Sequence, residues 1–386
     1  MDDLESFQAL FNLLIAPAHE DIELYTSYKK PFSLPPITSS ILQKLCFHVK
    51  NIFQIEPVLL NLKGTFVIVG DIHGHILDLY RIIKKFGLPD HDHNLQYLFL
   101  GDIVDRGEFS IESITLIFLM KALWPHNIFL LRGNHEFKTM CTQCGFLTNV
   151  IEYYSTYTVF DQFIDVFNYI PLAAILNNNK KILCFHGGIG PNLTTIDQIS
   201  NLHRPIEEFG NSIIDSILWS DPAPDPRITL YSPSSRGSGF YFGEKALCDF
   251  LNSNNVDIII RGHECISDGI SSLFQYHLIT VFSASNYCGL VGNKAGTIYC
   301  GMDFLNFQTY PPLPYLKKES QDIIASPICK FQIMPDSPSV TFLKVSSTES
   351  SLPSLHSIQN ANRTHIQKRK DSSKGRPHFD WSILKA

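Results

Sequence analysis

Residues 65–74 read TFVIVGDIHG, a short apolar run that ends in a cluster of glycine, aspartate and histidine. The run Thr65–Val69 has the length and the β-branched content of a buried strand. The glycines on either side of the polar pair fit tight turns that bring the backbone close to a ligand. The stretch therefore predicts a strand that ends in a polar loop carrying Asp71 and His73.

The same succession of apolar run and polar cluster recurs further along the chain. These runs are Tyr97–Leu100, Ile128–Leu131, Ile182–Phe185, Val256–Ile260 and Leu278–Phe282. Helical patterns lie between several of them, at 74–86, 110–123 and 155–168, and two more precede them, at 4–15 and 37–54. Strands that alternate with helices predict an α/β fold, in which the polar residues after the strands meet along one edge of a sheet.

The polar clusters contain carboxylate, imidazole and amide side chains but no thiolate. The candidate ligands are Asp71, His73, Asp102, Asn134, His186 and His263. Such a set suits Mn, Fe or Zn with five or six ligands and differs from the cysteine-rich set of a structural zinc. Each residue alone could equally be a turn or capping residue, but six are too many for one catalytic ion. The set therefore predicts two ions, about 3.5–4 Å apart, that share a carboxylate and act on a phosphoryl group.

Phosphoryl transfer also needs positive charge for the phosphate oxygens and a proton donor for the leaving group. Arg106 lies within the second cluster, and Arg236 and Arg261 are further candidates, although Arg261 could equally pair with a carboxylate. His135 directly follows one proposed ligand and could act as a general acid, oriented by Asp105.

Read in chain order, the clusters are GDIHG, GDIVDRG, RGNHE, HGG, RGHE and SASNYCG. At these residues the chain resembles the phosphoprotein phosphatase (PPP) family, which includes the type-1, type-2A and calcineurin enzymes. The resemblance extends from about residue 37 to about residue 310. It implies a metallophosphoesterase-type β-sandwich of mixed sheets flanked by helices, with a two-metal site at the sheet edge.

The resemblance also implies a role for each site residue. Asp71 and His73 would bind the first metal, and Asp102 would bridge both metals. The second metal would be completed by Asn134, His186 and His263. His135 would act as the general acid, paired with Asp105. The phosphate would be bound by Arg106, Arg236 and Tyr287. The implied reaction is hydrolysis of phosphoserine and phosphothreonine monoesters in proteins by hydroxide activated between two divalent ions. Manganese is expected to serve in vitro, with iron or zinc as alternatives.

Three departures from the family pattern qualify this resemblance. The segment before Arg236 lacks the Gly-Trp and Asn that family members often carry there. Ser285 replaces the usual proline of SAPNYCG, which predicts a looser loop. The segment 137–141 differs from the type-1 pattern, so no subfamily follows from the sequence.

Shifts in composition along the chain indicate its segments, and the overall composition argues against some classes of function. We expect an N-terminal extension (1–36), a catalytic domain (37–317) and a flexible C-terminal tail (318–386) that is rich in serine. A net charge of −6 argues against nucleic acid as a partner, and no apolar run reaches the length of a membrane span. Nine cysteines, an odd number, fit free thiols in a reducing compartment, and the Cys141–Cys144 pair lacks a second pair at zinc spacing.

Localisation and two alternative functions complete these expectations. The acidic N-terminus predicts an intracellular protein in the cytoplasm, with a nuclear location open because of the basic run 368–370. The partners would be phosphorylated proteins and regulatory or targeting subunits. The alternatives are a metallophosphoesterase acting on nucleotides and an inactive phosphatase that binds phosphoproteins as a scaffold, which would lack a ligand.

Overall fold

The computed structural model describes residues 3–27, 29–89, 95–318 and 378–380. The tail expected at 318–386 therefore lies outside the described residues, except for residue 318 and the backbone of residues 378–380. The boundaries of the three expected segments stay predictions.

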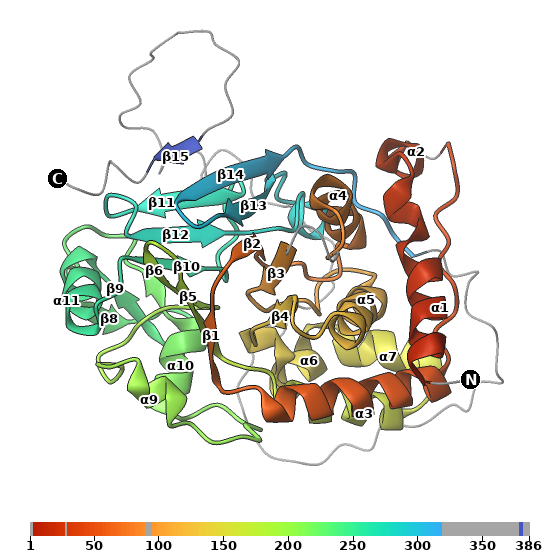
Figure 1. Cartoon of the computed structure of the whole chain (residues 1–386), viewed down its shortest axis with the longest axis horizontal. Helices are drawn as coiled ribbons and strands as arrows, with labels where there is room; N and C mark the ends of the chain where they lie inside the picture. Colours follow the sequence, from red (N-terminus) through yellow and green to blue (C-terminus); the bar gives the residue numbers. More distant parts are fainter. Residues whose placement is uncertain (1–2, 28, 90–94, 319–377, 381–386) are drawn as a thin grey trace, which may run out of the picture. The chain divides into compact units, whose positions relative to one another are not determined.

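Two six-stranded mixed sheets form the centre of the fold (Figure 1). The first sheet contains, in spatial order, β1 (Leu59–Leu62), β5 (Ala173–Asn177), β6 (Lys181–Phe185), β10 (Ile258–Arg261), β12 (Leu278–Val281) and β11 (Ile270–Leu273). The second contains β15 (His378–Asp380), β14 (Phe304–Tyr310), β13 (Ala295–Cys300), β2 (Thr65–Val69), β3 (Leu95–Phe99) and β4 (Ile128–Leu130). The strands that carry the polar clusters pair in parallel: β3 lies between β2 and β4, and β10 lies between β6 and β12.

The alternation of side chains along each strand explains why the sheets are covered on both faces. In β2, Phe66 and Ile68 belong to a core cluster that contains residues of both sheets, such as Ile182 and Ile260. The intervening Val67 and other residues of β2 belong to a second cluster, shared with helices. Because both faces are buried, the strands are continuous apolar runs rather than alternating ones.

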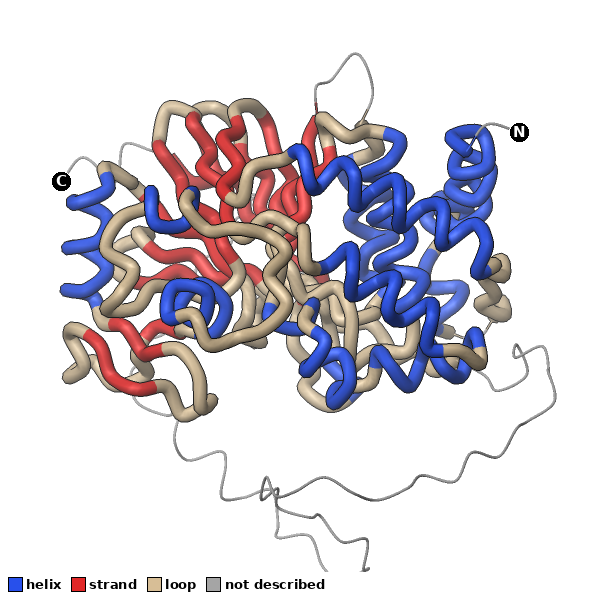
Figure 2. The backbone as a smooth tube through the Cα atoms, turned by 90° about the horizontal axis from the view of Figure 1, so that it is seen from below, coloured by secondary structure: helices blue, strands red, loops and turns tan. Residues whose placement is uncertain are grey.

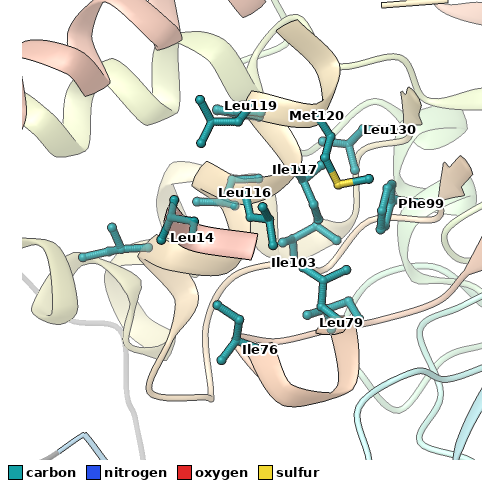
Figure 3. Packing of buried hydrophobic residues seen from close by; sticks show 14 of the residues in the cluster. Leu14, Ile76, Leu79, Phe99, Ile103, Leu116, Ile117, Leu119, Met120 and Leu130 are labelled. Carbon is teal, nitrogen blue, oxygen red and sulfur yellow. The ribbon is translucent and has the colours of Figure 1, made fainter. Parts of the chain in front are cut away.

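Helices cover the outer face of each sheet. On the second sheet these are α1 (Asp3–Ile15), α3 (Ser39–Ile55), α4 (Ile76–Phe86), α5 (Ser110–Leu123), α7 (Phe146–Tyr154) and α8 (Tyr157–Phe167). On the first sheet they are α10 (Ser212–Trp219) and α11 (Glu244–Asn254). Figure 2 shows most of the helices gathered on one side of the strands. Figure 3 shows α5 packing onto the strand residues Phe99 and Leu130.

Shorter elements complete the described part of the chain. The helical ones are η1 (Ala16–His19), α2 (Ile22–Thr26), η2 (Asn134–Glu136), α6 (Lys138–Cys144), α9 (Asp197–Ser200) and η3 (Tyr287–Gly289). A small sheet is formed by β7 (Asp221–Pro222), β9 (Phe240–Phe242) and β8 (Tyr231–Pro233). No helix in the described ranges is long and apolar enough to cross a membrane.

The N-terminal segment packs onto the same core as the strands. Phe7 and Leu14 of α1 are fully buried in the cluster that contains β2 and α5. Figure 3 places Leu14 beside Leu116 of α5. The aliphatic and aromatic face of α1 therefore completes the cover over α5, a helix that is buried on nearly every side. Its Lys121 is correspondingly buried and bonds Glu56 and two backbone carbonyls.

Candidate metal centre

The loops after β2, β3, β4, β6 and β10 meet where the two sheets adjoin. At this edge Asp71 forms an isolated parallel bridge with Phe282, which follows β12 of the other sheet. The hydroxyl of Ser283 accepts the Gly70 amide at 2.8 Å, and the Ser283 amide donates to the Asp71 carbonyl at 3.1 Å. These bonds fix the loops of the two sheets against each other, so the polar residues of both reach one place.

Several predicted site residues are held in the left-handed backbone region. His73, Asp102 and His263 have φ of 45°, 52° and 72°, and Asp105 and Arg106 have φ of 69° and 71°. Non-glycine residues adopt such angles at a cost of roughly 1–3 kcal/mol, and they concentrate at functional sites. The strain at these positions points to a site in which side-chain direction matters more than local stability.

Two glycines permit the close approach of loops around the carboxylates. A Cβ on Gly133 would lie 2.1 Å from Asp102 Oδ1, and a Cβ on Gly262 would lie 2.4 Å from Asp71 Oδ1. Any side chain at either position would push a carboxylate out of place. This explains physically why the RGNHE and RGHE clusters carry glycine at these points.

The first group of facing ligand atoms consists of Asp71, His73 and Asp102. His73 Nε2 lies 3.5 Å from Asp102 Oδ2 and 3.9 Å from Asp71 Oδ2. All three side chains are at most 3% exposed. One nitrogen and two carboxylate oxygens therefore face a common point in a buried site.

The second group shares Asp102 with the first. His186 Nε2 lies 3.2 Å from Asp102 Oδ2, 2.9 Å from Asn134 Oδ1 and 3.1 Å from His263 Nδ1. The structure thus places all six predicted ligands together, in two sets joined at Asp102. Their individual roles at a metal stay predictions.

Backbone groups determine which ligand atoms remain free. His73 Nδ1 bonds the Val104 carbonyl at 2.8 Å, and His186 Nδ1 bonds the Leu100 carbonyl at 3.0 Å. Each Nδ1 therefore donates a proton to a carbonyl, which leaves each Nε2 as the ring atom that faces the carboxylates and could bind a cation. One oxygen of each carboxylate accepts an amide, Asp71 from His263 at 3.0 Å and Asp102 from His135 at 2.9 Å.

The protonation of the cluster reflects the crowding of buried charges. Burial raises the pKa of Asp71 to about 7. Burial would also raise the pKa of Asp102, but the histidines around it, His186 first, hold that pKa well below its usual value. Burial opposes the charge on His186, yet Asp102 and Asp71 raise its pKa to about 9. Burial, reinforced by His135, lowers the pKa of His73 to about 3.

These residues fit a pair of divalent cations. Asp71 Oδ2 is buried and has no hydrogen-bond partner among the described residues. An orphaned buried carboxylate oxygen costs free energy unless a cation or donor satisfies it. The donor set of oxygen and nitrogen atoms, with second ring nitrogens bonded to carbonyls, is the chemistry that Mn, Fe and Zn take.

His135 and Asp105 form the predicted acid pair beside this site. His135 Nδ1 lies 2.7 Å from Asp105 Oδ2, and the His135 ring meets the His73 ring edge-on at a centroid distance of 4.7 Å. The second Asp105 oxygen accepts the Phe146 amide at 2.8 Å. Burial opposes protonation of His135, but Asp102 and Asp105 raise its pKa above the ordinary value.

The predicted phosphate-binding residues differ in their surroundings. Arg106 is exposed, and its charge acts on Tyr287 and Cys144 nearby. Tyr287 stands 5.2 Å from the His73 ring, centroid to centroid. Arg236 is partly exposed and bonds Asp221 through Nε at 2.6 Å.

Arg261 is fully buried, so of the two alternatives for this residue the structure favours the carboxylate partner. It bonds Asp221 Oδ1 at 2.8 Å and Glu264 Oε2 at 2.5 Å.

Glu136 is a supporting residue that sequence reasoning left without a role. Its buried carboxylate accepts the amides of Asp102 and Ile103, each at 2.8 Å, and of Gly133 at 2.9 Å. It therefore locks the loop after β3 onto the loop after β4. The sequence signal for this role was the position of Glu136 directly after His135, because a carboxylate that is buried beside the site needs several hydrogen-bond donors.

Ser285 also behaves differently from expectation, because the loop is tied down at this position. The Ser285 amide donates to Asp78 Oδ2 at 2.7 Å, and its hydroxyl donates to Asp78 Oδ1 at 3.0 Å. The hydroxyl in turn accepts the Leu313 amide at 3.1 Å. The loop that carries Tyr287 is thus anchored to α4 and to the segment after β14.

Comparison with known proteins shows the family to which this fold and this sequence pattern belong. The calcineurin-like phosphoesterase family matches residues 64–267. A serine/threonine-protein phosphatase of Arabidopsis thaliana, BSL2, is 39% identical over 269 residues, which cover 68% of this chain and 26% of that protein. The match thus spans only about a quarter of that plant relative.

Among solved structures, a protein serine/threonine phosphatase from Saccharomyces cerevisiae with similarity to human phosphatase PP5 is 30% identical, with a TM-score of 0.66. The likeness covers 74% of this chain and 92% of the yeast chain. A cold-active protein-tyrosine phosphatase of Shewanella is more distant, with 18% identity, a TM-score of 0.49, and cover of 67% of this chain and 82% of that one.

The chain belongs to the calcineurin-like phosphoesterases, a class of metal-dependent hydrolases. Within that class it is a homologue of the serine/threonine protein phosphatases of the PPP fold.

Proposed function

We propose that this protein hydrolyses phosphoserine and phosphothreonine monoesters in proteins, using two divalent cations held by the six clustered ligands. The observation that carries the proposal is the pair of ligand groups that share Asp102, immediately beside the His135–Asp105 pair. Two cations at this site supply a water of lowered pKa and positive charge for the phosphoryl oxygens.

Each residue of the site has a task that follows from its position. Asp71, His73 and Asp102 would hold one cation, and Asp102, Asn134, His186 and His263 would hold the other. Arg106 binds the phosphate from the open side, where its guanidinium is exposed. Burial contributes most to lowering the pKa of His263, and the charges of His186 and Arg236 lower it further, so Arg236 lies close enough to the ligands to assist.

His135 donates the proton that the leaving alkoxide needs. Serine and threonine oxygens are poor leaving groups, so protonation as the ester bond breaks lowers the barrier. Asp105 holds the ring through Nδ1 and helps to keep it protonated, which leaves Nε2 as the donor. Tyr287 lies 5.2 Å from the His73 ring, centroid to centroid, where it would line the site beside the phosphate.

Finer properties belong to the same proposal. We propose manganese as the metal that supports activity in vitro, phosphorylated proteins as substrates, and regulatory or targeting subunits as further partners. We also propose a cytoplasmic location, in keeping with thiols that are free among the described residues.

The test is phosphate release from a phosphothreonine peptide by the purified full chain with added Mn²⁺. Asp102→Asn removes the shared carboxylate and should abolish both metal binding and release. Asp303→Asn serves as the matched control, because Asp303 is exposed and distant from the ligand set in the fold. Metal content is measured on the same samples, so that loss of metal is separated from loss of folding.

Two outcomes would replace the proposal with an alternative. Faster hydrolysis of dinucleoside polyphosphates or cyclic nucleotides than of phosphopeptides would indicate a nucleotide phosphoesterase. A folded protein that binds phosphopeptides but holds no metal and releases no phosphate would indicate a scaffold.

A further inference from the structure

A third group of metal-ligating side chains lies behind the acid pair. The ligand atoms of Asp105, His135 and Cys144 all lie within 4.8 Å of one another. This group offers one oxygen, one nitrogen and one sulfur, whereas the two-cation site has no sulfur ligand. The difference in donor chemistry is what would let the two sites choose different metals.

Cys144 is partly exposed to solvent, in contrast to its neighbour Cys141. Cys141 is fully buried and its thiol donates to the His135 carbonyl at 3.0 Å. Cys144 is only partly buried at the end of α6, and its carbonyl accepts the Arg106 amide at 3.3 Å.

We propose that Asp105, His135 and Cys144 form an inhibitory site for a thiophilic divalent cation such as Zn²⁺ or Cd²⁺, beside the two-cation site. Three protein ligands and a water complete a tetrahedral shell. Bonds of about 2.0–2.3 Å place the ligand atoms of such a shell roughly 3.3–3.8 Å apart. The atoms His135 Nδ1 and Asp105 Oδ2 are now 2.7 Å apart and belong to the short end of that range, so they must separate by roughly 0.6 Å.

Binding of the cation releases two protons to solvent and oxidises nothing. One proton leaves His135 Nδ1, where it is now shared with Asp105, and the other leaves the Cys144 thiol. Burial raises the pKa of Cys144 while the Arg106 charge lowers it, and coordination itself drives the loss of a thiol proton. Zn²⁺ and Cd²⁺ prefer the thiolate, whereas Mn²⁺ prefers the oxygen-rich pair of sites.

Occupation of this site would stop the acid step. Coordination through Nδ1 would replace the hydrogen bond between His135 and Asp105 that orients the ring for this step. This consequence rests on the proposed function, whereas the existence of the site does not.

Cadmium binding tests the site directly. Cd²⁺ is titrated into the Mn²⁺-loaded full chain while the thiolate-to-metal charge-transfer absorption is recorded, a signal that only a sulfur ligand produces. One equivalent should saturate the band, which should vanish in Cys144→Ser and in Cys144→Ala. Cys248→Ser is the matched control, because Cys248 is a partly buried thiol on α11, distant in the fold. A band that survives in both Cys144 variants overturns the proposal.

Zinc inhibition tests the consequence. Each protein is compared with its own zinc-free rate on the phosphothreonine peptide. Loss of the sulfur ligand should raise the zinc concentration for half inhibition at least about tenfold in Cys144→Ser but not in Cys248→Ser. Equal sensitivity of the Cys144 and Cys248 variants would refute inhibition through this site. Absence of any phosphatase rate beside a Cys144-dependent cadmium band would refute the proposed function and uphold the cation site.

Discussion

Ser285 donates two hydrogen bonds to the carboxylate of Asp78, one from its amide at 2.7 Å and one from its hydroxyl at 3.0 Å. Both side chains are 2% exposed, and Arg81 pairs with the same carboxylate at 2.5 Å. A proline at position 285, as in the usual family motif, could make neither bond. Ser285 therefore fixes the loop that carries Tyr287 through polar bonds to Asp78, whereas the sequence alone predicted a looser loop at this position.

Replacing Ser285 should destabilise the protein in proportion to the donors lost. Ser285→Ala removes the hydroxyl and should lower the free energy of unfolding by about 1–2 kcal/mol, as a bond to a charged group is lost. Ser285→Pro also removes the amide and should cost about 2–4 kcal/mol. Urea unfolding measures both, with exposed Ser253→Ala as control. A proline variant as stable as the parent chain would show that the anchor contributes nothing.

Loss of His135 should depend on the leaving group. His135→Asn should lower kcat for a phosphoserine peptide by about 10²–10⁴-fold, because no proton reaches the alkoxide. An aryl phosphate, whose phenolate leaves readily, should suffer much less. Metal content should stay at the parent level, since His135 is not among the six ligands. Equal losses on both substrates would mean that His135 acts otherwise than as an acid.

The alkaline limb of the rate profile should report the Asp105–His135 pair. His135 must be protonated to donate, so activity falls as pH rises through its pKa, which its carboxylate neighbours raise above the ordinary value. Asp105→Asn removes one of these negative charges, lowers the pKa of His135, and should move the limb to lower pH. The measurement is kcat against pH for both proteins. A limb that stays in place, or moves to higher pH, would contradict the assignment.

Glu136→Gln should weaken metal binding without removing a ligand. The Glu136 carboxylate accepts hydrogen bonds from three backbone N–H groups within 2.9 Å, including that of Asp102. The glutamine side chain has an NH₂ group in place of one oxygen, and this group would face backbone N–H donors that it cannot bond. We expect a metal affinity lower by about 10–100-fold, as for other groups that orient ligands. Calorimetric titration with Mn²⁺ measures this, and Glu152→Gln on α7 is the control. Unchanged affinity would reduce Glu136 to a purely structural residue.

Local pattern was enough to locate the elements that carry the site. The expected run Thr65–Val69 is β2 without change, and the other five runs lie within two residues of β3, β4, β6, β10 and β12. Each run is buried on both faces, so its apolar character is continuous and its ends are marked by glycine and charge. The expected helices 4–15 and 110–123 are likewise α1 and α5.

Strands without a polar cluster were harder to predict. The antiparallel strands β13 and β14 and the edge strand β11 end in no recognisable motif, and the small sheet of β7, β8 and β9 has very short strands. Their pairing depends on partners that lie distant in the chain, such as β13 beside β2. A single sequence carries little information about such partners.

The sequence by itself determined the chemistry available to this protein, because residue types and their order after apolar runs are local properties. It named six candidate ligands, a candidate acid pair and the arginines expected at the phosphate. Only the tertiary structure decided how they divide: Asp102 lies between two ligand groups, Arg261 turns inward to Asp221, Glu136 locks two loops, and Cys144 reaches the acid pair. The reason is physical, since contacts between residues tens or hundreds of positions apart arise when buried sheets pack, and no local pattern encodes which side chains then face one another.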